Sequence, residues 1–233
     1  DYKIRNGNLK DVIKTFPVTL GTDFAGVVTD VAEGSDDFKT CDEVFGNAIV
    51  LGGGSGTLAE YVSANISATA LKPVSLNFVE AGGLPLAAAS ALQAIEEHIQ
   101  IKKGQKILIQ GGAGGIGSIA VQLAKMHGAY VAATTSPKTL EFVKKLGADE
   151  VIDYTSQNFQ ELKDYDAVFD TVGGETAKKS LPILKPGGII VSMGAQLDSE
   201  EVEKYKVTAI AQNTKSTADK FKRIAELIDS GRL

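Results

Sequence analysis

A glycine-rich break in an apolar stretch constrains the fold of this chain more than any other feature. The segment KILIQGGAGGIGSIAVQLAK, residues 106–125, passes from an apolar run into five glycines within seven residues and then into apolar positions at helical spacing. Gly112-x-Gly114-x-x-Gly117 therefore lies between a predicted strand and a predicted helix, the setting in which G-x-G-x-x-G has a mechanism. The early glycines permit a sharp turn and a close backbone approach to a pyrophosphate. The helix N-terminus attracts the anion. The segment predicts a dinucleotide site rather than a plain turn.

From this segment to the end of the 233-residue chain, strand-like runs alternate with helical ones. The predicted strands are KILIQ, YVAATT, EVIDY, DAVFDTV, GIIVSM and VTAIAQ, and the predicted helices cover 116–127, 138–146, 157–162, 176–184 and 216–228. This alternation is typical of an α/β fold with a Rossmann doubly wound parallel sheet.

The first hundred residues have a different texture. Short β-rich runs (GVVTDVA, EVFGNAIV and AEYVSA) are separated by Gly, Asp, Ser and Pro, and one helix is predicted over 85–100. We expect a small antiparallel, barrel-like domain here. The predicted domains are 1–96, for substrate and catalysis, and 97–233, for the dinucleotide.

Composition excludes several classes of function. The 24 Lys and Arg face 29 Asp and Glu without a basic cluster, so nucleic acid is not an expected partner. The single cysteine, Cys41, rules out an internal disulfide and favours a reducing compartment. No run approaches the roughly 20 apolar residues of a membrane span, and the opening is unlike a signal peptide. We therefore expect a cytoplasmic protein without a membrane partner.

The end of the second predicted strand indicates which dinucleotide is bound. Sites for NAD carry an acidic residue there, whereas this chain has AATTSPK. Thr134, Thr135 and Ser136 supply hydroxyls and Lys138 a cation, which suits a 2'-phosphate. NADPH is therefore the predicted cofactor, although Lys138 could equally be an ordinary solvent-exposed lysine.

Competing chemistries lack their residues. None of the six tyrosines has a lysine four positions on, as a short-chain reductase would need. With two histidines, His98 and His127, and one cysteine, the chain offers no catalytic zinc set, so no metal is predicted. A conjugated acceptor, an enone or a quinone, does not need a Lewis acid because its developing charge is delocalised onto oxygen.

With these residues in place, the chain resembles the quinone oxidoreductase (zeta-crystallin-like) branch of the medium-chain dehydrogenase/reductase superfamily. The resemblance covers nearly the whole chain. It includes Gly104-Gln105, the glycine motif, Gln122 and Lys125, and the runs LGTDFAG, DEVFG, GTLAEYV, LPLAAASALQAI, LGADEVIDY, VFDTVGG and LKPGGIIVSMG.

The resemblance implies a GroES-like first domain, of which the N-terminal strands and the returning C-terminal segment are expected to be missing from this chain. It implies a cofactor in a cleft between the domains, with the pyrophosphate on 113–116 and the nicotinamide near Val172. The implied cofactor-binding residues are Gly112, Ala113, Gly114, Gly115, Ile116, Gly117, Thr135, Ser136, Lys138, Tyr154, Val172, Met193 and Gly194.

The resemblance is less informative about catalysis. Where zinc-dependent relatives have Gly-His-Glu, this chain has Gly-Thr-Asp at 21–23, which implies a zinc-less member. Lys3 matches the lysine of an Asp-x-Lys element in enone-reducing members, and Tyr2 and Ser90 could lie beside the same pocket. Lys3 is as readily a surface charge at a frayed terminus. At Cys41 relatives usually have glycine.

The sequence thus predicts an NADPH-dependent, zinc-independent reductase of quinones or α,β-unsaturated carbonyls. Two alternatives stay open: an NADPH-binding protein with a structural or regulatory role and little turnover, and a methyltransferase, which the missing acid in AATTSPK disfavours. An apolar edge strand near 206–212 predicts a homodimer, unless a further segment covers it.

Overall fold

The computed structural model describes residues 1–233 except 10, 14–15, 35 and 195, and it leaves the side chains of Tyr2 and Lys3 undescribed. The chain forms two compact units. The smaller contains residues 1–89 and 216–232, and the larger contains residues 90–215 with Leu233.

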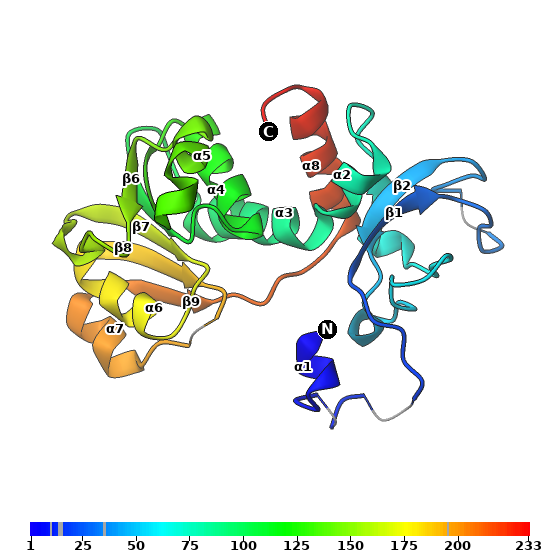
Figure 1. Ribbon diagram of the computed structural model, residues 1–233, viewed down its shortest axis with the longest axis horizontal. Coiled ribbons are helices and arrows are strands. Elements are labelled where there is room, and N and C mark those ends of the chain that lie inside the picture. The colour runs from blue at the N-terminus through cyan, green and yellow to red at the C-terminus, as the bar shows by residue number, and fades with distance from the viewer. Residues whose placement is uncertain (10, 14–15, 35, 195) are drawn as a thin grey trace. The chain divides into compact units, whose positions relative to one another are not determined.

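The larger unit is built on a six-stranded parallel sheet (Figure 1). In chain order its strands are β4 (Lys106–Gln110), β5 (Tyr130–Thr135), β6 (Glu150–Asp153), β7 (Tyr165–Asp170), β8 (Leu184–Ser192) and β9 (Thr208–Ala211). Their spatial order, β6-β5-β4-β7-β8-β9, reverses direction at β4. It is the order of a Rossmann sheet, so the Rossmann fold prediction is confirmed.

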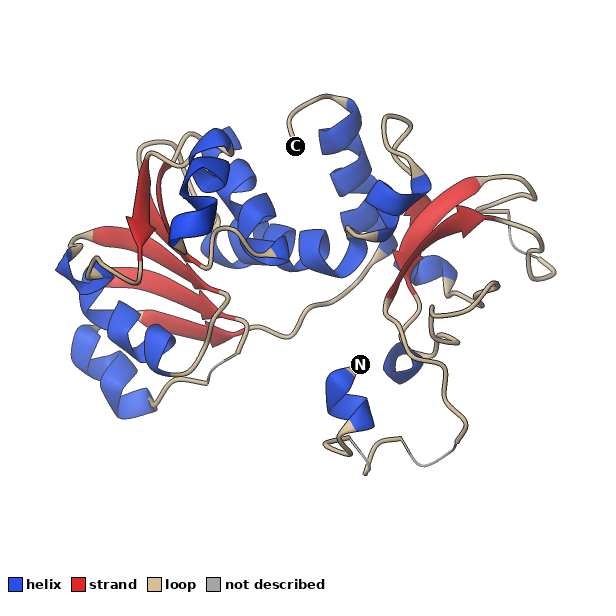
Figure 2. Ribbon diagram, in the orientation of Figure 1, coloured by secondary structure: helices blue, strands red, loops and turns tan. Residues whose placement is uncertain are grey.

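Helices cover both faces of this sheet (Figure 2). They are α4 (Gly115–Met126), α5 (Leu140–Lys145), α6 (Glu175–Ser180) and α7 (Ser199–Tyr205). Neighbouring strands contribute Leu108, Ala132, Val168 and Ile190 to one buried cluster. Strands covered on both faces read as continuous apolar runs, which is why the sequence located all six.

Two connections differ from the prediction. The helix expected over 157–162 is only a short 3-10 turn, Phe159–Glu161, because Asn158 accepts a hydrogen bond from the Gln160 amide and Leu162 is already extended. Helix α7 was not predicted. Its signal was present: Asp198 accepts hydrogen bonds from the amides of Glu200 and Glu201, as an N-cap does.

The smaller unit contains a three-stranded antiparallel sheet of β1 (Asp23–Val27), β2 (Glu43–Asn47) and β3 (Thr69–Leu71). Helices α1 (Tyr2–Arg5), α2 (Phe78–Gly82) and α8 (Ala218–Asp229) belong to the same unit. The strand predicted at AEYVSA, 59–64, is wrong: these residues form a loop with Tyr61 74% exposed, and β2 pairs with β3 instead. Two 3-10 turns, Val50–Gly52 and Ile66–Ala68, also belong to this unit, and two more, Pro137–Thr139 and Leu181–Ile183, belong to the larger unit.

Helix α8 lies in a different unit from the one expected. The sequence assigned it to the Rossmann domain, but Phe221 is fully buried and packs on Phe45 of β2 with ring centroids 5.6 Å apart. At its other end, Asp229 accepts hydrogen bonds from the amides of Val74 and Ser75. The buried contact between Phe221 and Phe45 and the hydrogen bonds of Asp229 hold α8 on the small sheet.

The expected helix over 85–100 is continuous but changes character. It begins as α3 (Pro85–Leu92) and continues as a π-helix, Gln93–Ile99, before Gln100 ends it with φ +52°. The division between the units falls at 89/90, inside α3, rather than at 96/97. A continuous helix carries no composition change to mark such a boundary.

Cys41 has a left-handed backbone, with φ +76°, and is exposed. It lies in the turn that leads into β2, where the Cys41 amide donates to the Val28 carbonyl oxygen. Only glycine adopts this conformation without a steric cost. This backbone conformation suits the glycine that, by the resemblance, relatives usually have at the position of Cys41.

Replacing Cys41 by glycine should stabilise the smaller unit by about 1 kcal/mol, because relief of the left-handed strain exceeds the added entropy of the unfolded chain. Chemical denaturation would measure the gain, and Cys41→Ala, which keeps the strain, is the matched control. An unchanged or lower unfolding free energy for Cys41→Gly would contradict this account.

Candidate functional site

The glycine loop is held from the neighbouring strand. The Gly111 amide donates to Oγ1 of Thr134 at 3.1 Å, and the Gly112 amide donates to the Thr134 carbonyl oxygen at 2.8 Å. Thr134 in turn donates to Oε1 of buried Gln110 at 2.7 Å. Thr134 was expected near the ligand phosphate. Its buried hydroxyl supports the loop from behind instead.

Two glycines of the motif are required by close packing. A Cβ on Gly117 would stand 2.1 Å from the Gly111 carbonyl oxygen, and one on Gly112 would stand 2.8 Å from Cβ of Ala133. No side chain fits at either position without moving the backbone. The loop and the first turn of α4 therefore pack together as bare backbone.

The start of α4 offers unpaired amides. Gly114 is the N-cap and provides no side-chain hydrogen bond, and the first helical bond runs from the Ser118 amide to the Gly114 carbonyl oxygen. The amides of Gly115, Ile116 and Gly117 precede that bond and have no intrahelical partner. The first turn has no acidic residue, so the positive end of the helix dipole is not neutralised. With exposed Gly114 and Gly115 in front, this geometry fits a pyrophosphate.

The end of β5 forms a cluster of hydroxyls. Oγ1 of Thr135 lies 2.6 Å from Oγ1 of Thr139, and Oγ of Ser136 lies 3.2 Å from the same atom. Lys138 is exposed in the turn before α5, next to Thr139 in the sequence. Tyr154 is exposed directly after β6, and its amide donates to the Thr135 carbonyl oxygen at 3.2 Å. Thr139 was missed by the sequence reasoning, although SPKT offered its hydroxyl three residues after Ser136.

The predicted residues of the other half of the site lie on two adjacent loops. Val172, 59% exposed, follows β7, and Met193 and Gly194 follow β8. The loops touch closely, since a Cβ on Gly173 would stand 3.1 Å from the Gly194 carbonyl carbon. Buried Asp170 accepts hydrogen bonds from the loop after β7 and from Ser192, the last residue of β8. The sequence reasoning missed Asp170, although an acid that ends an apolar strand was its signal.

The three predicted catalytic residues fare differently. The side chains of Tyr2 and Lys3 lie outside the described residues. Ser90 is fully buried, with Oγ 2.7 Å from Oγ1 of Thr214, and its carbonyl oxygen accepts from Nε2 of Gln212. The structure thus gives Ser90 a bracing role between α3 and the segment after β9. Its place beside the substrate pocket stays a prediction.

The smaller unit has its own groove, of about 1160 Å³. Its walls include Phe24, Val28, Tyr61 and Val79, and Asp23 lies among them. Burial raises the pKa of Asp23 from 3.8 to about 6, against hydrogen bonds from the Leu86 amide and the Asn47 side chain.

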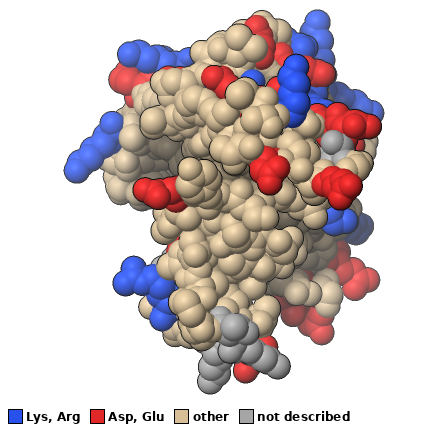
Figure 3. Space-filling model, turned by 90° about the vertical axis from the view of Figure 1, so that its right-hand side faces the viewer, with Lys and Arg blue, Asp and Glu red and all other residues tan. Residues whose placement is uncertain are grey.

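Figure 3 shows one face of the molecule, with acidic and basic side chains intermingled in its upper part and an uncharged centre.

Within the described residues, no three His, Cys, Asp or Glu side chains come together in a way that could hold a metal ion. A search of the same residues finds no helix with the length and apolar character that a membrane crossing requires.

Comparisons with known proteins agree with this geometry. The alcohol dehydrogenase GroES-like domain family matches residues 1–74, and the family described as zinc-binding dehydrogenase matches residues 115–220. The chain is similar to the NADPH-dependent alkenal/one oxidoreductase of Arabidopsis thaliana chloroplasts, with 38% identity over 100% of this chain and 59% of that protein. It is 43% identical to 2-methylene-furan-3-one reductase of Solanum lycopersicum, over 82% of this chain and 50% of that protein.

Among solved structures, the quinone oxidoreductase of Coxiella burnetii superposes with a TM-score of 0.86 and 31% identity, covering 100% of this chain and 75% of that one. A GroES-like unit joined to a Rossmann unit defines a medium-chain dehydrogenase/reductase. The chain belongs to the zinc-less, quinone oxidoreductase branch of that superfamily. It spans 59% and 50% of the two curated relatives named above.

Gly117→Ala should lower the unfolding free energy by about 2 kcal/mol or more, because its Cβ would displace the Gly111 carbonyl. Gly114→Ala is the matched control: a Cβ there would meet only the Gly111 carbonyl oxygen, at 3.3 Å, so we expect a cost below about 1 kcal/mol. Equal costs in urea denaturation would show that the close approach at Gly117 is unimportant.

The raised pKa of Asp23 predicts a pH-dependent stability. The folded state disfavours the carboxylate, so its penalty is absent below pH 3.8 and complete above about pH 6. The stability of Asp23→Asn relative to the wild type should therefore rise by about 2 kcal/mol between pH 4 and pH 8. Denaturation curves at several pH values would measure the difference. A pH-independent difference would contradict the raised pKa.

Proposed function

We propose that the protein containing this chain is an NADPH-dependent, zinc-independent reductase of α,β-unsaturated carbonyls or quinones. The observation that carries the proposal is the loop from Gly111 to Gly117, where bare backbone packs on backbone and leaves the first amides of α4 unpaired. The loop lies at the carboxyl edge of the sheet, where strand order reverses, the place at which doubly wound folds bind dinucleotides.

The preference for the phosphorylated dinucleotide rests on the end of β5. At this corner Ser136 offers a hydroxyl and Lys138 a cation, where an NAD site has an acid. Gly112 and Ala113 belong to the other part of the cofactor site, the loop proposed to hold the pyrophosphate. Thr135, Tyr154 and the missed Thr139 surround that corner. The name of the Arabidopsis relative, an NADPH-dependent alkenal/one oxidoreductase, supports the same cofactor.

The reaction balances with the cofactor and one proton. When bound, NADPH would supply a hydride equivalent for the β-carbon of an enone or for a quinone and would become NADP⁺. One proton would complete the product, at the α-carbon of the enolate or on the hydroquinone oxygen. The chain's own part is to hold both halves of the cofactor and to orient the nicotinamide between the loops after β7 and β8. The proton would come from water or a weak donor, for which Lys3 and Tyr2 stay predictions.

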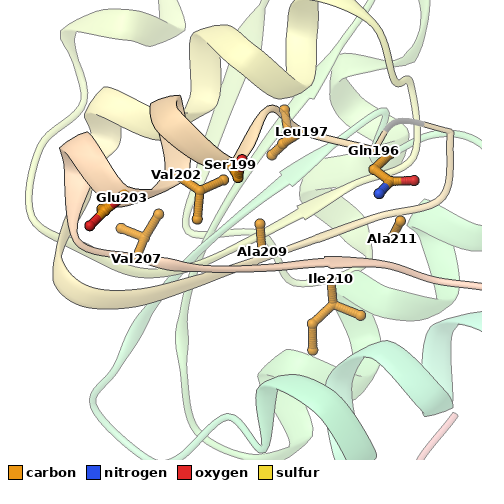
Figure 4. Close-up of a pocket in the computed structure, with 9 residues that line it drawn as sticks. All are labelled: Gln196, Leu197, Ser199, Val202, Glu203, Val207, Ala209, Ile210 and Ala211. Carbon is orange, nitrogen blue, oxygen red and sulfur yellow. The ribbon is translucent and has the colours of Figure 1, made fainter.

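A homodimer is proposed as well. Strand β9 is at the end of the described sheet, and beside it α7 and β9 line a hollow of about 640 Å³ that Leu197, Val202 and Val207 make apolar (Figure 4). Edge strands of this kind pair readily. A monomer mass in sedimentation equilibrium would contradict the dimer. The cytoplasmic location stays a prediction, testable by cell fractionation.

The test is NADPH oxidation by the full-length protein, with NADH for comparison, an enone panel, a quinone panel, and a metal chelator in parallel reactions. We expect turnover that prefers NADPH and is insensitive to the chelator. Tight NADPH binding without turnover on either panel would replace the enzyme by an NADPH-binding protein of another role. Loss of turnover with the chelator would contradict zinc independence.

The corner at Lys138 can be tested in the same assay. Lys138→Ala should raise the KM for NADPH by about tenfold and leave that for NADH unchanged, since only NADPH carries the 2'-phosphate. Lys144→Ala, an exposed lysine in the last turn of α5, is the matched control. Equal effects of Lys138→Ala on the two cofactors would remove Lys138 from the site.

A further inference from the structure

A buried carboxylate ties together the two loops at the carboxyl ends of β7 and β8. Asp170, the last residue of β7, has no exposed surface. Its carboxylate accepts hydrogen bonds from the amides of Val172 at 3.1 Å and Gly173 at 3.0 Å, and from Oγ of Ser192 at 2.7 Å. The Gly194 amide donates to the same Ser192 oxygen at 3.3 Å. The shape of both loops thus depends on one side chain.

The hydrogen bonds of Asp170 suit a carboxylate side chain. Its carboxylate oxygens receive hydrogen bonds from two backbone amides and a hydroxyl, and the amides can only donate. Oδ1 accepts from the amides of Val172 and Gly173, and Oδ2 accepts from the Gly173 amide, so both oxygens serve as acceptors, as those of a carboxylate do. Among the ion pairs of the described residues, none involves Asp170. Within the described part of the chain, the carboxylate of Asp170 is therefore solvated by amide and hydroxyl dipoles and not by a cation.

The sheet order indicates what this charge faces. A doubly wound sheet binds one half of a dinucleotide on each side of the reversal point. The glycine loop after β4 and the hydroxyl cluster after β5 occupy one side, and the loops after β7 and β8 occupy the other. The second half carries the nicotinamide. Its ring is neutral in NADPH and positively charged in NADP⁺.

We propose that Asp170 is an electrostatic positioning residue, whose buried charge favours the oxidised nicotinamide over the reduced one. Its hydrogen bonds hold Val172 directly, and Gly194 through Ser192, beside the ring. The proposal rests on the proposed NADPH-dependent function. A buried charge acts through a lower effective dielectric than water, so its effect persists over several ångströms. By favouring NADP⁺, Asp170 would make bound NADPH a stronger hydride donor.

The test compares the dissociation constants of NADP⁺ and NADPH, measured by titration calorimetry without substrate. We expect Asp170→Asn to raise the ratio Kd(NADP⁺)/Kd(NADPH) by about five- to tenfold. By linkage, a tenfold change is a shift of about 30 mV in the potential of the bound two-electron couple. Ser192→Ala is the matched control: it removes the bond that joins the loops without changing the charge, so it should weaken both forms alike.

A second pair of variants covers the case in which Asp170→Asn does not fold. Val172 is exposed on the same loop, so Val172→Lys is compatible with the fold and places a cation where the carboxylate acts. It should raise the same ratio, whereas the neutral Val172→Gln should not. An unchanged ratio in Asp170→Asn, or in Val172→Lys when the first variant is unfolded, would overturn the electrostatic role.

The outcome also separates this inference from the proposed function. If the wild-type protein binds neither NADPH nor NADP⁺, the function and the role of Asp170 both fail. If it binds both and the ratio does not respond to charge, the function stands and Asp170 only shapes the loops.

Discussion

The larger unit depends on one contact between backbone segments, in which the first turn of α4 packs directly on the carbonyl of Gly111. A Cβ at Gly117 would stand 2.1 Å from the Gly111 carbonyl oxygen, so no side chain fits there. Such an approach brings the helix axis close to the sheet and aims its N-terminus at the space above the strand ends. Every other feature of the site is arranged around the resulting loop.

Polar side chains from three strand ends hold that loop in place. Gln110 accepts from Thr134 through its side chain and from Thr171 through its carbonyl oxygen, and it donates to Ser180. Asp170 provides the corresponding support for the second half of the site. Both side chains are buried with hydrogen bonds to their polar atoms, as polar groups in a low-dielectric interior must be. The larger unit thus exposes loop backbone at the carboxyl edge of its sheet, and the polar side chains that support these loops are buried beneath them.

The sequence was most informative where local pattern and tertiary role coincide. The six parallel strands are apolar on both faces, and the glycine motif has one structural meaning between a strand and a helix, so both could be predicted. Side-chain partners could not. The hydroxyls of Ser90 and Thr134 are engaged by Thr214 and Gln110, which are distant in sequence. The place of α8 depends on the contact between Phe221 and Phe45, which the hydrophobic periodicity of the helix cannot predict.

The return of α8 to the small sheet affects how the chain can fold. The smaller unit is discontinuous: its described strands precede the Rossmann unit, and helix α8, which packs on Phe45, follows it. During synthesis, β1, β2 and β3 leave the ribosome long before the helix that covers them, whereas the Rossmann segment is contiguous and can form as it emerges. The contacts between α8 and the small sheet have a high sequence separation, and contacts of this kind form slowly. Until then, a partner such as a chaperone would find the surface beneath α8 uncovered.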